Sequence, residues 1–345
     1  MRTLSMVAAA WLALLSLTAC DNTATQNSAG EVNLYSSRHY DTDLALYDDF
    51  TRDTGIQVNR IEAGADELIA RIQSEGESSP ADLLITVDAG RLWRAEQAGI
   101  FQAVDSAVLT ERLPDNMRHP EGLWIGLSKR ARVIVYNREA GLPTPLADYT
   151  DLADPTHVGK VCIRSSSNIY NVSLMASIVA HLGEAAAELW AEGVVRNFAR
   201  TPQSNDTGQI RAVASGECQI AVVNTYYLAR LAASDDPADL AVAAAVGIVF
   251  PGQQGNGTHV NISGAGVVST SPNRDNAIRF LEYLTSDRAQ SLFADGNNEY
   301  PAVPSVGASS KVAALGEFKE DGLNATELGV HQSTAIMVFD RAGWQ

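Results

Sequence analysis

Short apolar segments rich in β-branched residues alternate with amphipathic segments at the start of the chain, and this alternation constrains the fold more than any other feature. Strands are predicted at Glu31–Ser37, Gly55–Ile61 and Ala81–Val87, and they are separated by a helix beginning near Asp43 and a helix at Glu67–Glu75. This pattern is typical of an α/β fold with a mostly parallel sheet covered on both faces. The side chains that follow each strand then meet at one edge of the sheet, where ligands of such folds bind.

The middle of the chain predicts a second lobe joined to the first by two crossings. A long β-rich passage from Leu123 to Tyr136 leads out of the first lobe, and a predicted strand at Val260–Val268 leads back into it. A chain that leaves a lobe and returns to it creates two hinge segments, so the lobes can close on each other. We therefore expect an N-terminal lobe and a C-terminal lobe with these bounds: residues 31–130 with 260–305, and residues 131–259 with 306–345.

Inside the second lobe the pattern predicts further short strands and helices. Strands are expected at Lys160–Arg164 and Cys218–Val223, and the apolar run Ala241–Phe250 is predicted to be another strand. A helix is expected at Glu184–Ala199 and another at Thr207–Ser215.

The first residues of the chain predict secretion. Arg2 is followed by an apolar stretch at 7–17 that is too short to span a bilayer, as in a secretory signal. The sequence Leu17-Thr18-Ala19-Cys20 resembles the processing site of bacterial lipoproteins, which makes residues 1–19 the signal peptide and Cys20 the lipidated first residue. The alternative is ordinary cleavage nearby, which leaves a soluble periplasmic protein. Residues 20–30 are small and polar and are expected to form a flexible tether.

The chain is acidic, with 41 Asp and Glu against 25 Lys and Arg and a net charge of −16. Such a surface repels nucleic acid and suits cations, so no nucleic-acid partner is expected. The sequence contains no nucleophile elbow, phosphate-binding Walker loop, dinucleotide fingerprint or zinc-protease helix motif. We therefore expect a monomeric binding protein rather than an enzyme.

Two cysteines besides Cys20 lie on predicted strands of the second lobe. Cys162 and Cys218 form an even pair, and in an oxidising compartment such a pair favours a disulfide over two buried thiols. Their spacing does not match a zinc or iron–sulfur site.

Two adjacent phenols form the most unusual side-chain grouping in the sequence. Tyr226 and Tyr227 follow the apolar strand Cys218–Val223 and open a predicted helix, with Arg230 one turn further on. Tyr40 and Tyr170 also follow predicted strands and begin predicted helical segments. All four phenols are therefore expected near the sheet edge that faces the cleft.

Phenolate oxygen is a strong donor for a hard cation such as ferric iron. Ionising one tyrosine at pH 7 costs about 4 kcal/mol, so several phenolates require a nearby positive centre. Four phenolates and one ferric ion leave one negative charge, which Arg230 neutralises from the second coordination shell unless it is simply solvated on its helix. The alternative for any single tyrosine is an ordinary core or surface position, which four other tyrosines are expected to occupy: Tyr35, Tyr47, Tyr136 and Tyr283.

Five segments resemble the periplasmic ferric-iron-binding proteins that serve ABC importers. The specific motif is Asn224-Thr225-Tyr226-Tyr227, and the supporting segments are Leu34–Tyr40, Ala81–Leu84, Asn298–Pro301 and Asp340–Trp344. The resemblance implies a two-lobed periplasmic solute-binding fold of type II that captures Fe³⁺ between its lobes. It also implies delivery to an ABC permease and its ATPase, with no turnover by the chain itself.

The resemblance also implies a set of ligands. The twin tyrosines of the family fall on Tyr226 and Tyr227, and Tyr40 and Tyr170 match the ligands of its tyrosine-rich branch, with His39 as an optional fifth ligand. That branch needs no bound anion. Asp88 lies near the position where another branch places a carboxylate ligand, but its expected role is that of an N-cap.

Two other functions stay open at this point. The same fold can hold an organic cation or another small solute between stacked tyrosines, and an envelope hydrolase is a third alternative.

Overall fold

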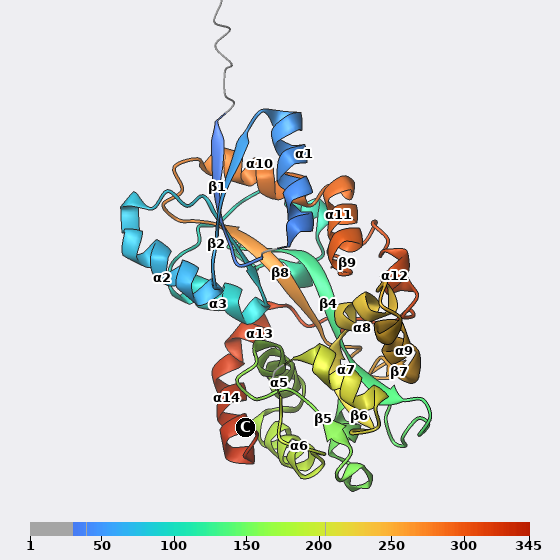
Figure 1. The fold of residues 1–345 in the computed structure, drawn as a ribbon. Coiled ribbons are helices and arrows are strands. Elements are labelled where there is room, and N and C mark those ends of the chain that lie inside the picture. Colours follow the sequence, from blue (N-terminus) through green and yellow to red (C-terminus); the bar gives the residue numbers. More distant parts are fainter. Residues whose placement is uncertain (1–29, 39, 204) are drawn as a thin grey trace, which may run out of the picture.

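The computed structural model describes residues 30–38, 40–203 and 205–345. The predicted signal peptide, all of the tether before residue 30 including Cys20, and His39 lie outside these residues. Figure 1 shows two lobes that are joined by long strands and by the C-terminal helices.

The first lobe contains the first three strands that the sequence predicts, and its helices cover both faces of the sheet. Its strands are β1 (Glu31–Ser36), β2 (Gln57–Glu62) and β3 (Leu83–Val87). Its helices are α1 (Leu44–Thr54), α2 (Ala65–Glu75), α3 (Ala89–Gln97), α4 (Ala107–Arg112), α10 (Arg274–Leu284) and α11 (Asp287–Asn297).

The second lobe is built mostly from the middle of the chain. Its strands are β5 (Val161–Cys162), β6 (Ile220–Asn224) and β7 (Val246–Val249). Its helices are α5 (Ile169–Leu182), α6 (Glu184–Arg196), α7 (Asp206–Ala214), α8 (Thr225–Ala232), α9 (Pro237–Ala245), α12 (Ser310–Ala313) and α14 (Gln332–Ala342).

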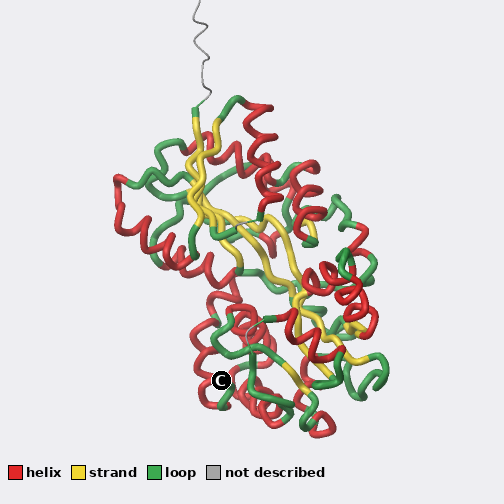
Figure 2. The backbone as a smooth tube through the Cα atoms, in the orientation of Figure 1, coloured by secondary structure: helices red, strands yellow, loops and turns green. Residues whose placement is uncertain are grey.

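Four elements run between the lobes: β4 (Ile125–Asn137), β8 (Val260–Val267), β9 (Tyr300–Pro301) and α13 (Thr326–Val330). The predicted passage from Leu123 to Tyr136 is confirmed as the single strand β4. Its 13 residues extend about 43 Å at about 3.3 Å per residue, which is enough to run from one lobe into the other. Figure 2 shows the strands continuing through both lobes with helices packed around them.

The strands form one mixed sheet with the order β2-β1-β3-β8-β4-β6-β5, and β7 and β9 also pair with β4. The pairs β1–β2, β1–β3 and β5–β6 are parallel, whereas every pairing of β4 or β8 is antiparallel. The expectation of a mostly parallel sheet is therefore wrong. The reason is that β4 leaves the first lobe while β8 enters it, so these neighbouring strands run in opposite directions.

The predicted strand Ala241–Phe250 is a helix in its first half. The side chain of Asp236 accepts a hydrogen bond from the amide of Ala238, and Pro237 occupies the first helical turn. Both features favour a helix start, and the alanine run that follows has the highest helix propensity. The strand β7 begins only at Val246, so apolar character alone does not distinguish these two segments.

Separate hydrophobic clusters stabilise the two lobes. One cluster includes Leu34, Phe50 and Phe280 in the first lobe, and the others include Trp190 and Val223 in the second lobe. Residues Ala325 and Leu328, which the sequence assigned to the second lobe, pack into the cluster of the first lobe instead. The segment around α13 therefore contributes to the connection between the lobes.

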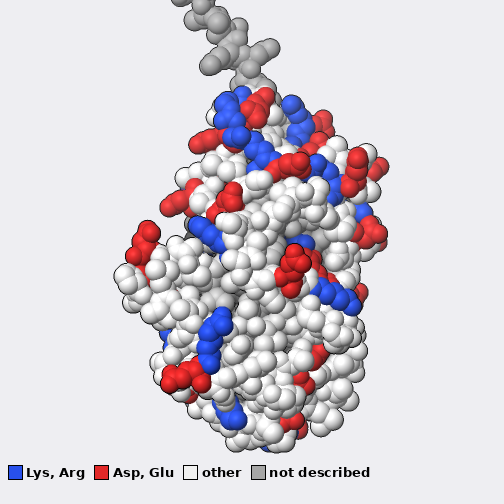
Figure 3. Space-filling view, turned by 90° about the vertical axis from the view of Figure 1, so that its right-hand side faces the viewer, with Lys and Arg blue, Asp and Glu red and all other residues white. Residues whose placement is uncertain are grey.

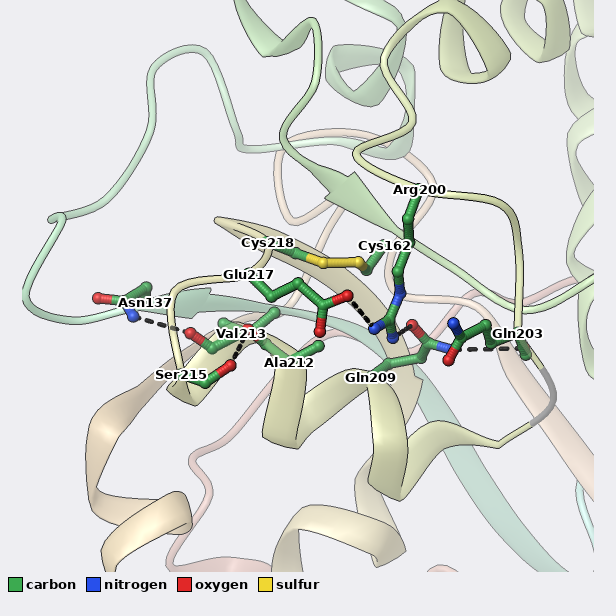
Figure 4. The surroundings of a disulfide bond; sticks show 10 residues. All are labelled: Asn137, Cys162, Arg200, Gln203, Gln209, Ala212, Val213, Ser215, Glu217 and Cys218. Carbon is green, nitrogen blue, oxygen red and sulfur yellow. Dashed lines mark hydrogen bonds and ion pairs between the residues drawn. A yellow bond between two sulfur atoms is a disulfide. The ribbon is translucent and has the colours of Figure 1, made fainter.

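The two cysteines of the second lobe form a disulfide in the structure, and Figure 4 shows its surroundings. The bond joins β5 to the segment that precedes β6, across a sequence separation of 56 residues. Next to it, Arg200 forms an ion pair with Glu217 and a hydrogen bond with Gln209. Closing a long loop restricts the unfolded chain, so the disulfide stabilises the sheet edge near the predicted site.

Charged side chains are unevenly distributed over the surface. In Figure 3, side chains of both signs intermingle over the first lobe, whereas much of the second lobe on this face is uncharged. The net negative charge is therefore not gathered in one patch on this face. Among the described residues, no helix has the length and apolar character needed to cross a membrane.

We predict that His259, which precedes β8 between the lobes, makes the fold sensitive to acid. Burial lowers the pKa of His259 from 6.5 to about 4. The unfolded chain therefore binds a proton at His259 more readily than the folded chain does. The stability that comes from the neutral His259 is fully present above about pH 6.5 and is lost as the pH falls through about 4. The expected loss is about 3 kcal/mol.

Chemical denaturation of wild type and His259→Gln between neutral pH and pH 4 measures this contribution. The variant should lose less stability on acidification than wild type. An identical pH dependence in the two proteins would contradict a buried neutral His259.

Candidate metal centre

The twin tyrosines lie where the sequence predicts them, at the junction of β6 and α8. The helix begins at Thr225, directly after the fully buried strand. Tyr226 is 4 % exposed and Tyr227 is half-buried, and their ring centroids are 4.2 Å apart. The adjacent rings therefore pack against each other instead of pointing to opposite sides of the helix.

Tyr170 joins this pair from the start of α5. The side chain of Asn168 caps that helix by accepting a hydrogen bond from the amide of Tyr170 at 3.2 Å. The hydroxyl of Tyr226 donates to the hydroxyl oxygen of Tyr170 at 3.5 Å. Adjacent oxygen ligands on an octahedral metal with bonds of about 2.0 Å lie roughly 2.9 Å apart, so these two oxygens are close to that spacing.

Tyr40 approaches from the first lobe. It immediately precedes the short 3₁₀ helix Asp41–Asp43, and the guanidinium carbon of Arg38 lies 4.9 Å from its ring centroid. Its ionised form interacts electrostatically with Tyr170 of the second lobe. The structure thus brings together the four phenols that the sequence singled out, from both lobes: Tyr40, Tyr170, Tyr226 and Tyr227.

The surroundings of Tyr40, Tyr226 and Tyr227 favour the protonated phenol. Burial raises the pKa of Tyr226 well above 10, and the neighbouring Tyr170 and Tyr227 raise it further. Burial also raises the pKa values of Tyr40 and Tyr227. Each additional phenolate is unfavourable beside the others, so ionising them together needs a strong cation in their midst.

Two buried arginines of the first lobe and hinge lie beside the phenols, and sequence reasoning missed both. Arg38 donates to Asp43, Glu299 and Ser263, and Arg130 donates to Glu299 and Ser263. The charge of Arg130 lowers the pKa values of Tyr40 and Tyr226, although burial and neighbouring phenols outweigh it. These arginines favour phenolate formation without replacing a metal.

A signal for these arginines exists in the sequence. Arg130 and Arg132 follow Ser128 and Lys129 in the predicted strand and, two residues apart, lie on the same face of β4. Both are 1 % exposed. Charged residues are rarely buried unless they are paired or functional, so two arginines inside a predicted buried strand indicate an internal polar site.

Arg230 faces the twin tyrosines as expected. Its guanidinium carbon lies 5.8 Å from the ring centroid of Tyr226 and 5.9 Å from that of Tyr227. The side chain is exposed, so it is both solvated and within reach of the rings. His39, the optional fifth ligand, lies outside the described residues.

Asp88 has a structural role in the first lobe. Its Oδ1 accepts hydrogen bonds from the amide of Gly90 at 2.8 Å and from the hydroxyl of Ser173 at 2.7 Å, and its Oδ2 accepts from Asn261 at 2.8 Å. The carboxylate is fully buried and caps α3. Because Ser173 belongs to α5, Asp88 connects the first lobe to the helix that carries Tyr170.

A cavity of about 530 Å³ separates the lobes beside this contact. Arg91 and Arg94 line it from the first lobe, and Asn168 and Ile169 line it from the second lobe. None of the four phenols lines this cavity, so it is separate from the phenol cluster.

In the part of the chain that the structure describes, no group of three or more His, Cys, Asp or Glu side chains is arranged to hold a metal ion.

Comparison with known proteins places the chain among transport proteins. The family model of bacterial extracellular solute-binding proteins matches residues 78–318. The chain is 53 % identical to iron uptake protein A1 of Synechocystis sp. (strain ATCC 27184 / PCC 6803 / Kazusa), over 93 % of this chain and 89 % of that protein.

Solved structures agree with this placement. The chain resembles Trichodesmium IdiA (FutA) in complex with iron and citrate ligands, with a TM-score of 0.89 and 56 % identity over 92 % of this chain and 100 % of that one. It resembles apo FutA2 from Synechocystis PCC6803 with a TM-score of 0.88 and 54 % identity, over 91 % of this chain and 99 % of that one. The expected two-lobed fold class is thereby confirmed.

We predict that Asp88→Asn leaves metal binding by the phenols intact. Asparagine tolerates the φ of 91° at this position and retains an oxygen acceptor for Gly90 and Ser173, while the charge is lost. Metal analysis after loading with ferric iron should give the wild-type stoichiometry. Loss of bound iron from a folded Asp88→Asn protein would instead identify Asp88 as a ligand.

Proposed function

This chain belongs to the bacterial extracellular solute-binding proteins, and we propose that it captures ferric iron between its lobes for delivery to an ABC importer. The phenol cluster carries this proposal, because it gathers Tyr40 from the first lobe with three tyrosines of the second. The iron-related descriptions of its relatives support the same cargo.

The proposed ligands are Tyr40, Tyr170, Tyr226 and Tyr227, with His39 as an optional fifth. Ferric iron supplies the positive charge that makes ionisation of the buried phenols favourable. Arg230 neutralises the residual negative charge from outside the ligand shell. As in the tyrosine-rich branch of the family, we propose that this ligand set needs no bound anion.

Closure of the lobes completes the site. A ligand that contacts both lobes has a higher affinity for the closed state and therefore shifts the population toward it. The hydrogen bond between Ser173 and Asp88 joins the lobes one helical turn from Tyr170, so it favours the same state. Opening separates Tyr40 from the other phenols and releases the cargo.

The geometry favours a metal over an organic cation. An aromatic cage for an organic cation presents ring faces to the ligand. Here the rings of Tyr226 and Tyr227 pack on each other, and the hydroxyls of Tyr226 and Tyr170 meet. Converging oxygens suit direct coordination of a small, hard ion.

One serine and one histidine share a carboxylate in the structure, but their arrangement does not support a hydrolase. Ser177 and His181 both hydrogen-bond to Asp321, and the structure shows no hydrogen bond between the two. A nucleophile needs contact with its base, which this arrangement does not provide. We propose a binding protein without turnover.

The proposed cellular arrangement follows the sequence. The signal peptide directs the chain to the periplasm, where Cys20 carries a lipid that anchors it to the inner membrane and residues 20–30 act as a tether. The protein works there as a monomer and delivers iron to the permease and its ATPase.

We predict that Tyr226→Phe combined with Tyr227→Phe abolishes the visible absorption of the iron-loaded protein. The colour comes from charge transfer between phenolate and ferric iron, and the double variant removes two phenolates while preserving both rings. Absorption spectra and iron analysis measure the effect.

Tyr283→Phe is the matched control. Its buried hydroxyl has no hydrogen-bond partner in the described part of the chain, so the substitution should preserve both fold and colour. Full iron content in the Tyr226 and Tyr227 double variant would refute the proposed ligands.

We also predict that iron binding releases protons and weakens on acidification. The raised pKa values of Tyr40, Tyr226 and Tyr227 mean that these phenols are protonated at neutral pH, so each must lose a proton to bind iron. The affinity should fall about tenfold per pH unit for each proton displaced. Competition with a chelator of known pH dependence measures this slope, and a pH-independent affinity would exclude protonated phenols as the ligands.

A further inference from the structure

The segments that carry Tyr170 and the twin tyrosines are 56 residues apart in sequence, yet their hydroxyls meet. We propose that Arg132, held in place by Asp206, is the positioning residue that sets the spacing between these segments. This inference rests on the proposed function, because it concerns how the same ligands are arranged for iron.

Arg132 contacts the neighbours of both tyrosine positions. Its Nη2 donates to Oδ1 of Asn171 at 2.7 Å, and its Nη1 donates to Oδ1 of Asn224 at 3.2 Å. Asn171 directly follows Tyr170, and Asn224 is the N-cap residue of the helix that carries Tyr226. One rigid guanidinium therefore connects the starts of α5 and α8.

Asp206 completes the connection. Its Oδ2 accepts from Nη1 of Arg132 at 2.8 Å and from the backbone amide of Asn224 at 2.8 Å. Asp206 is 0 % exposed, and its other oxygen lies 3.5 Å from Nη1 of Arg164. The guanidinium carbon of Arg164 lies in turn 5.4 Å from the ring centroid of Tyr170.

The loop before Tyr170 is fixed by the same group of residues. The amide nitrogen Nδ2 of Asn171 donates to the carbonyl oxygens of Arg164 at 2.7 Å and Ser165 at 3.2 Å. Asn171 thus receives a hydrogen bond from Arg132 and holds its own preceding backbone. Displacement of Arg132 frees the helix start that carries Tyr170 from the helix start that carries Tyr226.

The chemistry of this position requires arginine. A planar guanidinium donates in several fixed directions, whereas a lysine ammonium is a point charge on a flexible stem. The backbone of Arg132 is also fixed, because its amide donates to the carbonyl of His259 and its carbonyl accepts from the hydroxyl of Tyr149. Hydrogen bonds therefore hold both the backbone and the guanidinium of Arg132. A side chain that sets the distance between metal ligands needs this rigidity.

The test uses the full-length protein and ferric iron supplied with a competing chelator. Arg132→Met combined with Asp206→Asn removes the guanidinium together with the carboxylate that pairs with it, and the asparagine oxygen still accepts from the amide of Asn224. Arg164 loses its carboxylate partner in this variant, so the fold is checked separately. We expect an affinity loss of about tenfold or more and a shifted charge-transfer band, as for other residues that orient metal ligands. The unfolding temperature of the iron-free protein reports separately on the fold.

Asn171→Ala provides a second, milder variant. It removes the contact between Arg132 and the Tyr170 segment while the ion pair with Asp206 remains. The band should shift from its wild-type position, so this variant tests the inference even if the double variant does not fold. A purely structural role changes the unfolding temperature without changing the charge-transfer band.

Asp49→Asn combined with Arg288→Met is the matched control. It removes an ion pair of the first lobe that contacts neither tyrosine segment, so affinity and band should stay at wild-type values. Wild-type affinity and spectrum in folded Asn171→Ala protein would overturn the inference. Absence of iron binding by wild type would instead overturn the proposed function, and with it this inference.

Discussion

The central constraint on this site is the free energy needed to ionise several buried phenols that lie side by side. Tyr226 is almost inaccessible to solvent, and each neighbouring phenolate makes its own ionisation less favourable. The free protein therefore holds neutral hydroxyls at Tyr40, Tyr226 and Tyr227, and under the proposed function a highly charged cation converts them into ligands. The positive charges of Arg38 and Arg130 reduce this cost. Both arginines are already paired with Glu299, so they do not balance the negative charge of several phenolates.

The strands that connect the lobes also contact the residues around the phenols. Strand β4 carries Arg130 beside the phenols and Arg132 behind them, and it continues from the first lobe into the second. Strand β8 returns beside it and supplies Asn261 to Asp88, which also accepts a hydrogen bond from Ser173 in the opposite lobe. The strands that connect the lobes thus also hold the proposed ligands, and under the proposed function this arrangement would couple lobe closure to metal coordination.

The sequence predicts which segments form strands and helices better than it predicts which strands run antiparallel. It also predicts the phenols better than the buried ion pairs that hold them in place. Short apolar segments rich in β-branched residues identify β1, β3 and β6, and a phenol after a strand indicates the proposed site. Strand direction around the hinge is not encoded locally, and the alanine run of α9 is apolar enough to suggest a strand. The support network was missed because its contacts are distant: Arg38 pairs with Glu299 across 261 residues and Arg132 with Asp206 across 74. Only the presence of Arg130 and Arg132 within a predicted strand indicated that such a network exists.

Anomalous X-ray scattering at the iron edge, measured on crystals of the ferric-loaded protein, tests the central claim most directly. The account predicts one strong iron peak in the cleft, with the hydroxyl oxygens of Tyr40, Tyr170, Tyr226 and Tyr227 about 2 Å away, as is typical of oxygen ligands. A cleft without an iron peak, or an iron bound elsewhere while these hydroxyls keep their protons and point away, would contradict it.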